Sequence, residues 1–449
     1  MPQDVELETN IDRWRGYVLR RQAIAPADVD ELEDHLRGQV ADLRATGLDD
    51  NEAFLIAITR LGNLDAVSRE FAREHSERLW KQLSLVPEDP EHDSAPAWQE
   101  LAVVLGLGVG AGIAFKVGGI LIHDSGALVR NAGLLVLPFV VGYFGWRRRI
   151  SIPVAAVLLV AFAALAVVLN AYPYAANGST ETLAALHVLV IEWLLVGVAY
   201  VAGRWRSDAR RMDFARFTGE LVIYFVLLAL GGGVLLGLTA AVLGLIGIDV
   251  ATVMGDWVMP FAVPGALIVA AWLVEAKKNV VENIAPVLTK IFTPLTIVML
   301  LTVLTALVAS GSLGSVNRDL LIAMDAVLIL VECLLLYAIS ARDPMTRAGL
   351  FDAVQLVLVV AALAVDAVML AAMVTRIAEF GTSPNKLAAL GLNLLLLVQL
   401  LGTAWFTVGF LRGARPFASL ERWQTRYLPV YGAWATVVVV AFGPIFGFA

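Results

Sequence analysis

The chain has 449 residues, of which 59% are hydrophobic and 16% charged, and its mean hydropathy is +0.76. This composition excludes an ordinary soluble protein and is typical of a chain that crosses a membrane several times. The formal net charge is -7, and residues 1–97 hold 11 basic against 21 acidic side chains. Because so acidic a front segment is repelled by nucleic acid, we expect no nucleic-acid partner.

Residues 1–83 are predicted to form a small helical domain. Apolar residues recur at spacings of three and four between Val29 and Leu43, which is helical periodicity, and Gly47 lies where that helix would end. The first twenty residues are too charged for a signal peptide, so we expect this domain to stay in the cytoplasm. Residues 84–97 are predicted to be a linker, because this stretch is rich in proline and acidic residues.

A short pattern in this domain can be compared with known families. It consists of Glu31-Leu32-Glu33-Asp34-His35-Leu36, Gly47-Leu48, Glu52-Ala53, Ala57 and Leu61-Gly62-Asn63. Over residues 10–80 the pattern resembles the permease prefix domain, related in style to the HAAS domain of bacterial membrane proteins. The resemblance implies a regulatory or interaction module without chemistry of its own, and a cytoplasmic protein partner. The membrane part resembles uncharacterised bacterial multi-pass proteins.

Residues 98–449 are predicted to be a transmembrane bundle. Eleven apolar segments are long enough, or nearly so, to cross a hydrocarbon core, which takes about 20 helical residues. They are residues 100–122, 131–146, 151–171, 182–203, 218–246, 257–275, 287–310, 319–341, 350–375, 386–411 and 429–448. The predicted fold class is therefore all-α, a polytopic α-helical membrane protein of about 11 transmembrane helices in contact with the lipid bilayer.

The distribution of lysine and arginine predicts the orientation of this bundle. Connections assigned to the cytoplasm hold sixteen Lys and Arg residues, and those assigned to the other side hold four. Positive charge is enriched in cytoplasmic loops. We therefore expect a cytoplasmic N-terminus and an extracytoplasmic C-terminus, and the resemblance above implies a bacterial inner membrane.

Glycines and prolines within the apolar segments predict close packing and kinks. Gly106, Gly108, Gly110 and Gly112 repeat every second residue, and small residues four apart let helices approach closely. The triplet at residues 231–233 and the prolines in segments six and seven are predicted to interrupt their helices, as kinks or as the broken helices of ion sites.

Three carboxylic acids stand inside the eighth and ninth segments, at Asp325, Glu332 and Asp366. An isolated carboxylate in such a segment is expensive, and acids there often mark ion or proton pathways. Asp325 and Glu332 are seven residues apart and share a helix face, so one buried polar interface can serve both. Purely structural polar packing is the alternative.

Further polar residues are candidates for the same pathway. Lys116 is predicted to pair with Asp325, Asp366 or Glu192, or else to extend its amine to the outer interface. His187 and Glu192 lie on one segment and could extend a proton relay. Asparagine and glutamine side chains in the segments would join helices by hydrogen bonds.

A cluster of arginines follows the fourth segment. These are Arg204, Arg206, Arg210, Arg211 and Arg216. They are predicted either to contact lipid headgroups or to dock the acidic front domain, since opposite potentials attract.

The residues carry no motif for nucleotide, metal or nucleophilic chemistry, so no cofactor or metal is expected, and the chain is not expected to be an enzyme. Cys333 is the single cysteine and is predicted to be a small buried hydrophobic residue. The favoured role is a signalling, regulatory or scaffold protein whose front domain couples the bundle to a cytoplasmic partner. A secondary transporter, proton-coupled through the buried carboxylates, is the alternative. A membrane-embedded enzyme acting on lipid is the third hypothesis.

Overall fold

The structure is a computed structural model of the whole chain. It describes residues 97–176, 178–245, 249–276, 284–309, 318–342 and 346–449, together with scattered positions nearer the N-terminus: 7, 11, 33, 36–41, 43, 44, 48, 49, 53, 54 and 57. The chain divides into two compact units, Met1–Ser94 and Ala95–Ala449. Each unit is considered by itself.

In the first unit, the described residues include part of the predicted apolar stripe. Leu36, Val40 and Leu43 are helical and buried, and they belong to one core with Ile11 and Ala57. The helical spacing therefore does mark a buried face. Ala53 of the prefix-like pattern belongs to the same core, and Leu48 packs against it. Outside the described residues lie Glu31, Leu32, Asp34, His35, Gly47, Glu52 and residues 61–63 of the pattern, and the predicted linker up to residue 96.

The second unit is built of helices alone in its described residues. They are α5 (Ala97–Leu121), α6 (Ser125–Arg148), α7 (Ile152–Ala171), α8 (Ser179–Tyr200), α9 (Asp208–Leu245), α10 (Ala251–Val253), the π-helical η1 (Met254–Val258), α11 (Met259–Ala276), α13 (Ile284–Ala309), α14 (Arg318–Ser340), α15 (Leu350–Phe380), α16 (Pro384–Leu411), α17 (Ala418–Val437), the π-helical η3 (Val438–Phe442) and α18 (Gly443–Ile445).

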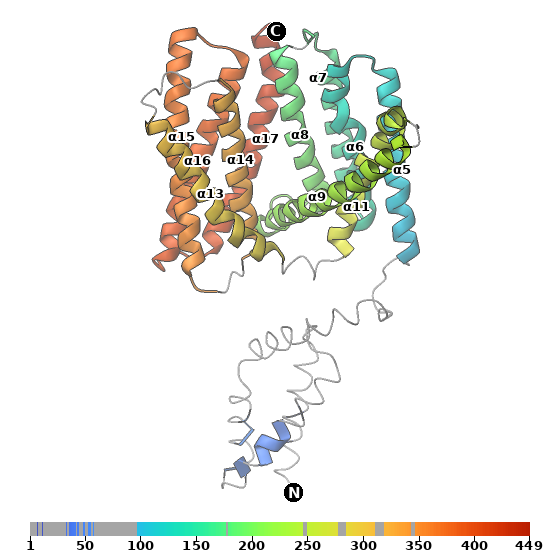
Figure 1. Ribbon diagram of the computed structural model, residues 1–449. Helices are drawn as coiled ribbons and strands as arrows, with labels where there is room; N and C mark the ends of the chain where they lie inside the picture. Colours follow the sequence, from blue (N-terminus) through green and yellow to red (C-terminus); the bar gives the residue numbers. More distant parts are fainter. Residues whose placement is uncertain are drawn as a thin grey trace. The chain divides into compact units, whose positions relative to one another are not determined.

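Eleven helical segments in the described part of the chain are long and apolar enough to cross a membrane, with α10 to α11 and α17 to α18 each counted as one. The predicted number of spans is confirmed, and the chain is a polytopic α-helical membrane protein. The start of α5 and the C-terminus lie at opposite ends of the bundle (Figure 1), as an odd number of crossings requires.

Two apolar cores divide this unit. The first bundle comprises α5 to α9 and α11, packed around Tyr143, Phe144 and Phe217. The second bundle comprises α13 to α17, packed around residues such as Leu328 and Leu358. Helix α8 contacts α16 and α17 and so joins the two bundles.

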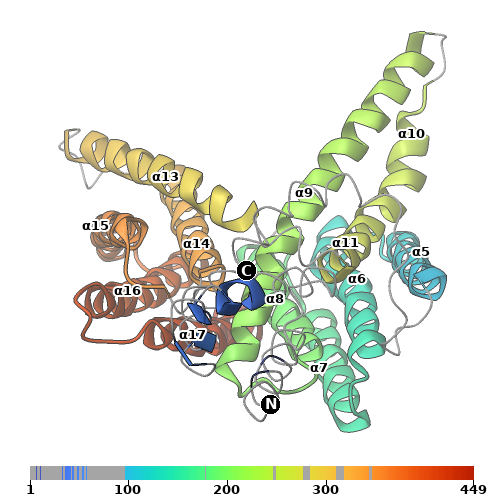
Figure 2. The ribbon, with the colours of Figure 1, turned by 90° about the horizontal axis from the view of Figure 1, so that it is seen from below.

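Helices α9 and α13 diverge from the rest of the bundle (Figure 2). None of residues 222–245 of α9 is buried, and large side chains such as Val226, Leu230 and Val234 are exposed. The same holds for Leu295 and Val298 of α13. In a membrane-spanning protein these apolar faces contact lipid.

Several helices begin earlier than their predicted spans, α6, α9 and α17 among them. Helix α6 starts at Ser125 rather than 131, α9 at Asp208 rather than 218, and α17 at Ala418 rather than 429. The predicted spans begin after charged residues such as Arg130, and the last one begins at Pro429. In the structure charged residues lie within the helices and are paired, as Arg130 of α6 is with Glu181 of α8. Pro429 lies inside α17.

The described helices are not broken at the predicted positions. Helix α9 runs continuously through residues 231–233, and α11 and α13 contain Pro264 and Pro294 within their helices. Kinks at these residues stay a prediction. The predicted close packing is confirmed at three glycines of α5. A side chain on Gly110 would meet the Phe139 ring of α6, and Gly108 and Gly112 lie directly against α11.

Gly112→Val should destabilise the protein by about 1–3 kcal/mol, because overfilling a packed contact forces its neighbours to shift. A Cβ atom at Gly112 would stand 2.3 Å from Phe261 Cδ1 and 3.0 Å from Phe261 Cα. Gly106→Val is the matched control, since no atom lies within 4 Å of its Cβ position. The thermal unfolding midpoint of the purified protein in detergent measures both, and equal midpoints would contradict the packing argument.

Candidate functional site: polar residues inside the second bundle

Two carboxyl groups of α14 face α16. Asn393 Nδ2 donates a hydrogen bond to Asp325 Oδ1 at 2.8 Å, and Gln399 Nε2 donates one to Glu332 Oε1 at 3.0 Å. Residues seven apart lie on the same side of a helix. The spacing of the two acids therefore does place both at one interface, and carboxyl–amide hydrogen bonds join α14 and α16 at two levels.

The hydrogen bonds continue from Gln399 to α17. Gln399 Nε2 also donates to Gln424 Oε1, and Gln424 Nε2 donates to the Thr403 hydroxyl at 3.0 Å. Trp423 Nε1 donates to the Gln399 carbonyl oxygen at 3.0 Å. Gln399, Thr403 and Gln424 are each 1% exposed. These residues form a continuous chain of polar contacts from α14 through α16 to α17.

Asp366 of α15 lies in the same bundle but differs from the other two acids. It has no exposed surface, and neither carboxyl oxygen has a hydrogen-bond partner among the described residues. The Asp325 carboxyl group is near enough to act on it electrostatically. Tyr431 of α17, whose hydroxyl likewise has no hydrogen-bond partner in the part of the chain that the structure describes, lies near both Glu332 and Asp366. Four helices thus contribute to one polar cluster.

Helix α16 carries this polar character along most of its length. Asn393, Gln399, Thr403 and Thr407 are all buried. Fourteen residues separate the first from the last, which is about 21 Å at the rise of an α-helix. The hydrocarbon core of a bilayer is about 30 Å thick. The buried polar stripe therefore extends over most of the depth that lipid would cover.

The carboxyl groups of this arrangement can bind protons. A carboxyl group accepts or releases a proton in place, and amide and hydroxyl side chains hydrogen-bond to either form because they carry both donors and acceptors. An isolated buried charge is costly without a partner. A change of protonation at Asp366 is therefore coupled to how tightly the surrounding helices can pack.

Glu192 occupies a separate position in the first bundle. It has no exposed surface and no hydrogen-bond partner among the described residues, and it faces Gly133 of α6. His187 Nδ1 makes a 2.8 Å hydrogen bond to the Leu183 carbonyl oxygen of its own helix. Neither residue is hydrogen-bonded to Asp325, Glu332 or Asp366, so the structure does not extend the cluster to them.

The predicted pairing of Lys116 with a buried acid is wrong. Lys116 Nζ donates to the Asp256 carbonyl oxygen and lies 4.7 Å from the centre of the Trp257 ring. Both partners belong to η1, where a π-helical turn precedes α11. A backbone oxygen and an aromatic face satisfy the amine without a carboxylate. Cys333 also differs from its prediction, because it is exposed on the outer face of α14.

The five arginines after α8 have unequal environments. Arg211 is buried and bonded to the Trp205 carbonyl oxygen and to Asp208, and Arg216 donates to the Ser340 carbonyl oxygen. Arg204, Arg206 and Arg210 are exposed. Docking of the front domain on this cluster stays a prediction, and it would have to use these three exposed arginines.

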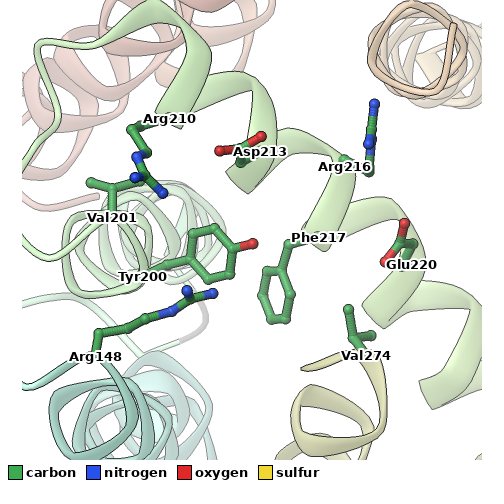
Figure 3. Close-up of a pocket in the computed structure, with 9 residues that line it drawn as sticks. All are labelled: Arg148, Tyr200, Val201, Arg210, Asp213, Arg216, Phe217, Glu220 and Val274. Atoms are coloured by element: carbon green, nitrogen blue, oxygen red, sulfur yellow. The ribbon is translucent and has the colours of Figure 1, made fainter. Parts of the chain in front are cut away.

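A cavity of about 220 Å³ lies elsewhere, at the end of the first bundle where α6, α8 and α11 end and α9 begins (Figure 3). It is lined by Arg148, Tyr200, Val201, Arg210, Asp213, Arg216, Phe217, Glu220 and Val274. None of the three acids of the second bundle belongs to this lining.

No protein family, curated protein or solved structure matches this chain. The side chains described above are therefore the basis on which a function can be argued. Among the residues that the structure describes, no three His, Cys, Asp or Glu side chains come together as metal ligands.

The sequence missed Gln424 and Tyr431 as members of the polar cluster. Gln424 lies before Pro429, where the predicted eleventh segment begins, whereas it belongs to α17. Trp423 and Tyr427 of α17 also donate to α16, to the carbonyl oxygens of Gln399 and Leu395. The helical spacing of Trp423, Gln424 and Tyr427 in the sequence was the available signal. An aromatic hydroxyl such as that of Tyr431 has no such signal, since its role depends on which helices surround it.

Proposed function

We propose that this chain is a proton-coupled secondary transporter in which Asp366 binds the coupling proton and Asp325 and Glu332 assist it. The observation that supports this most strongly is the Asp366 carboxyl group, which is fully buried and lacks a hydrogen-bond partner among the described residues. Ionisable groups inside membrane helices are costly and most often serve ion or proton movement.

The surrounding polar chain supports the same function. Asp325 and Glu332 are held by the amides of Asn393 and Gln399, and the stripe on α16 extends the polar contacts along the helix. The cavity described above lies away from these acids. In this proposal a path to Asp366 opens by movement of helices α14 to α17, as alternating access requires.

The regulatory role favoured by the sequence belongs, in this proposal, to the front domain. Two observations support this role. They are the prefix-like pattern of residues 10–80 and the distribution of Lys and Arg, sixteen against four, which favours a cytoplasmic position for that domain. The front domain would then regulate the transporter rather than carry out a separate function.

Asp366→Asn should abolish proton movement, because an amide cannot bind and release a proton at this position. The full chain is reconstituted into vesicles that contain a pH-sensitive dye, and a potassium diffusion potential drives proton entry. Without its substrate a coupled transporter moves protons only by uncoupled leak, so we expect the wild type to exceed protein-free vesicles and the variant to stay at their level. Infrared spectra should also lose one protonated-carboxyl band in the variant, and this readout needs no transported substrate.

Glu192→Gln is the matched control, since Glu192 is equally buried and equally without partners but lies in the first bundle. It should remove its own carboxyl band and leave proton uptake unchanged. If Asp366→Asn keeps wild-type uptake and only lowers the unfolding temperature, Asp366 is structural and the transporter proposal fails.

A further inference from the structure

The cavity at the end of the first bundle is lined by charges of both signs. Arg148 makes hydrogen bonds of 2.8 and 2.9 Å to the two carboxyl oxygens of Glu275 and stacks 4.8 Å from the centre of the Tyr200 ring. Arg216 donates to the Ser340 carbonyl oxygen. Two of the three arginines of the lining thus already have partners within the protein.

Arg210 and Asp213 differ from them. The side chains of both line the cavity and are exposed, and neither makes a hydrogen bond or ion pair with the residues that the structure describes. They lie three residues apart on α9, on one side of the helix. Figure 3 shows the Tyr200 ring between the Arg210 and Arg148 side chains. The cavity therefore offers one cation and one anion that are available to a ligand.

We propose that this cavity binds a phosphoethanolamine group, with Arg210 on the phosphate and Asp213 on the ammonium. Arginine forms strong charge-assisted hydrogen bonds to phosphate oxygens. The rings of Tyr200 and Phe217 in the lining are faces against which an ammonium is attracted. A simple anion matches the site less well, because Asp213 and Glu220 would repel it.

The size and place of the cavity fit this ligand. Pockets for drug-sized ligands occupy roughly 300–1,000 Å³, so a cavity of about 220 Å³ suits a smaller polar group. The lining lies beside Trp146 and the arginines that follow it, residue types typical of the membrane interface. From Val222 onward α9 exposes apolar side chains along which acyl chains would lie.

The group has two sources, the headgroup of a zwitterionic phospholipid and a soluble phosphoethanolamine ester. This convergence of polar groups at one interface is what a protein acting on lipid would need, and the proposal concerns binding alone. It is independent of the proton site, which lies in the other bundle.

The test is native mass spectrometry of the full chain in detergent, titrated with phosphatidylethanolamine, phosphatidylglycerol and phosphatidylcholine of identical acyl chains. We expect saturable binding that favours phosphatidylethanolamine. Arg210→Gln should weaken it about tenfold, the loss expected when one charge-assisted hydrogen bond is removed. Asp213→Asn should shift the preference from phosphatidylethanolamine towards phosphatidylglycerol. The substitution removes the carboxylate that pairs with the ammonium, and the same carboxylate would otherwise repel the anionic headgroup.

Arg412→Gln is the control, an exposed arginine at the same end of the bundle and outside the cavity. Arg210 and Asp213 are exposed, and unchanged unfolding temperatures would verify that their variants fold. The proposal would be overturned if the wild type preferred phosphatidylglycerol, or if Arg210→Gln left the affinity for phosphatidylethanolamine unchanged. Glycerophosphoethanolamine is then added at a concentration equal to that of the lipid. If it displaces the lipid, the ligand is a soluble ester, and if it does not, the ligand is the lipid headgroup.

Discussion

Arg130→Met is expected to lower the free energy of unfolding by about 3–5 kcal/mol, the range for removing one partner of a buried ion pair. Arg130 of α6 is paired with Glu181 of α8, and their side chains are only 13% and 7% exposed. The guanidinium also lies 5.3 Å from the centre of the Tyr174 ring. The loss arises because Glu181 would be left as a buried charge without its cation. Unfolding in mixed detergent micelles measures it.

The control is the double variant Arg130→Met/Glu181→Leu. Apolar side chains of similar volume often replace a buried ion pair at little cost, so most of the lost stability should return. A double variant no more stable than Arg130→Met would show that the arginine acts through its packing on Tyr174 rather than through the pair.

Gln399→Leu should cost about 2 kcal/mol or more, because two buried acceptors lose their donor at once. Gln399 Nε2 serves both Glu332 Oε1 and Gln424 Oε1, and no other donor to either atom is described. The unfolding free energy of the purified chain is the measurement. Proton uptake in vesicles should fall as well, since the link between α14 and α17 is lost.

Two variants accompany this prediction. Val398→Leu changes the neighbouring residue on the exposed side of α16 and should stay within about 0.5 kcal/mol of the wild type. Gln399→Leu/Glu332→Leu removes one of the two stranded acceptors and should recover part of the loss. Strictly additive effects of the two substitutions would argue against a direct contact between these side chains.

Helix number and the spacing of the acids were predictable. Each span has to satisfy its own backbone polar groups in a helix and present apolar side chains to lipid. A segment that meets this requirement can therefore be recognised from its own residues. For the same reason Asp325 and Glu332 share one face of α14 whatever surrounds them. The starts of α6 and α17 were not predictable, because they depend on pairing Arg130 with Glu181 and on packing around Pro429.

Partners across helices could not be inferred. Lys116 stands among apolar residues in the sequence, which suggests that its amine needs a carboxylate partner. In the structure η1 instead supplies a backbone oxygen and the Trp257 ring. Arg210 belongs to a run of five arginines, and only the fold separates it from Arg211, which is buried three residues from its partner Asp208. Such differences depend on which helix lies beside which.

The sequence by itself determined that this protein crosses the membrane eleven times and carries buried acids in spans eight and nine, because hydropathy and helical period are local properties of the chain. The tertiary structure alone decided that Asp366 has no hydrogen-bond partner among the described residues while Asn393 and Gln399 hold the other two acids, and that Arg210 and Asp213 meet at one cavity. Those facts come from contacts between segments far apart in sequence, and side-chain hydrogen bonds are short-ranged, so only the packing of the helices can set them.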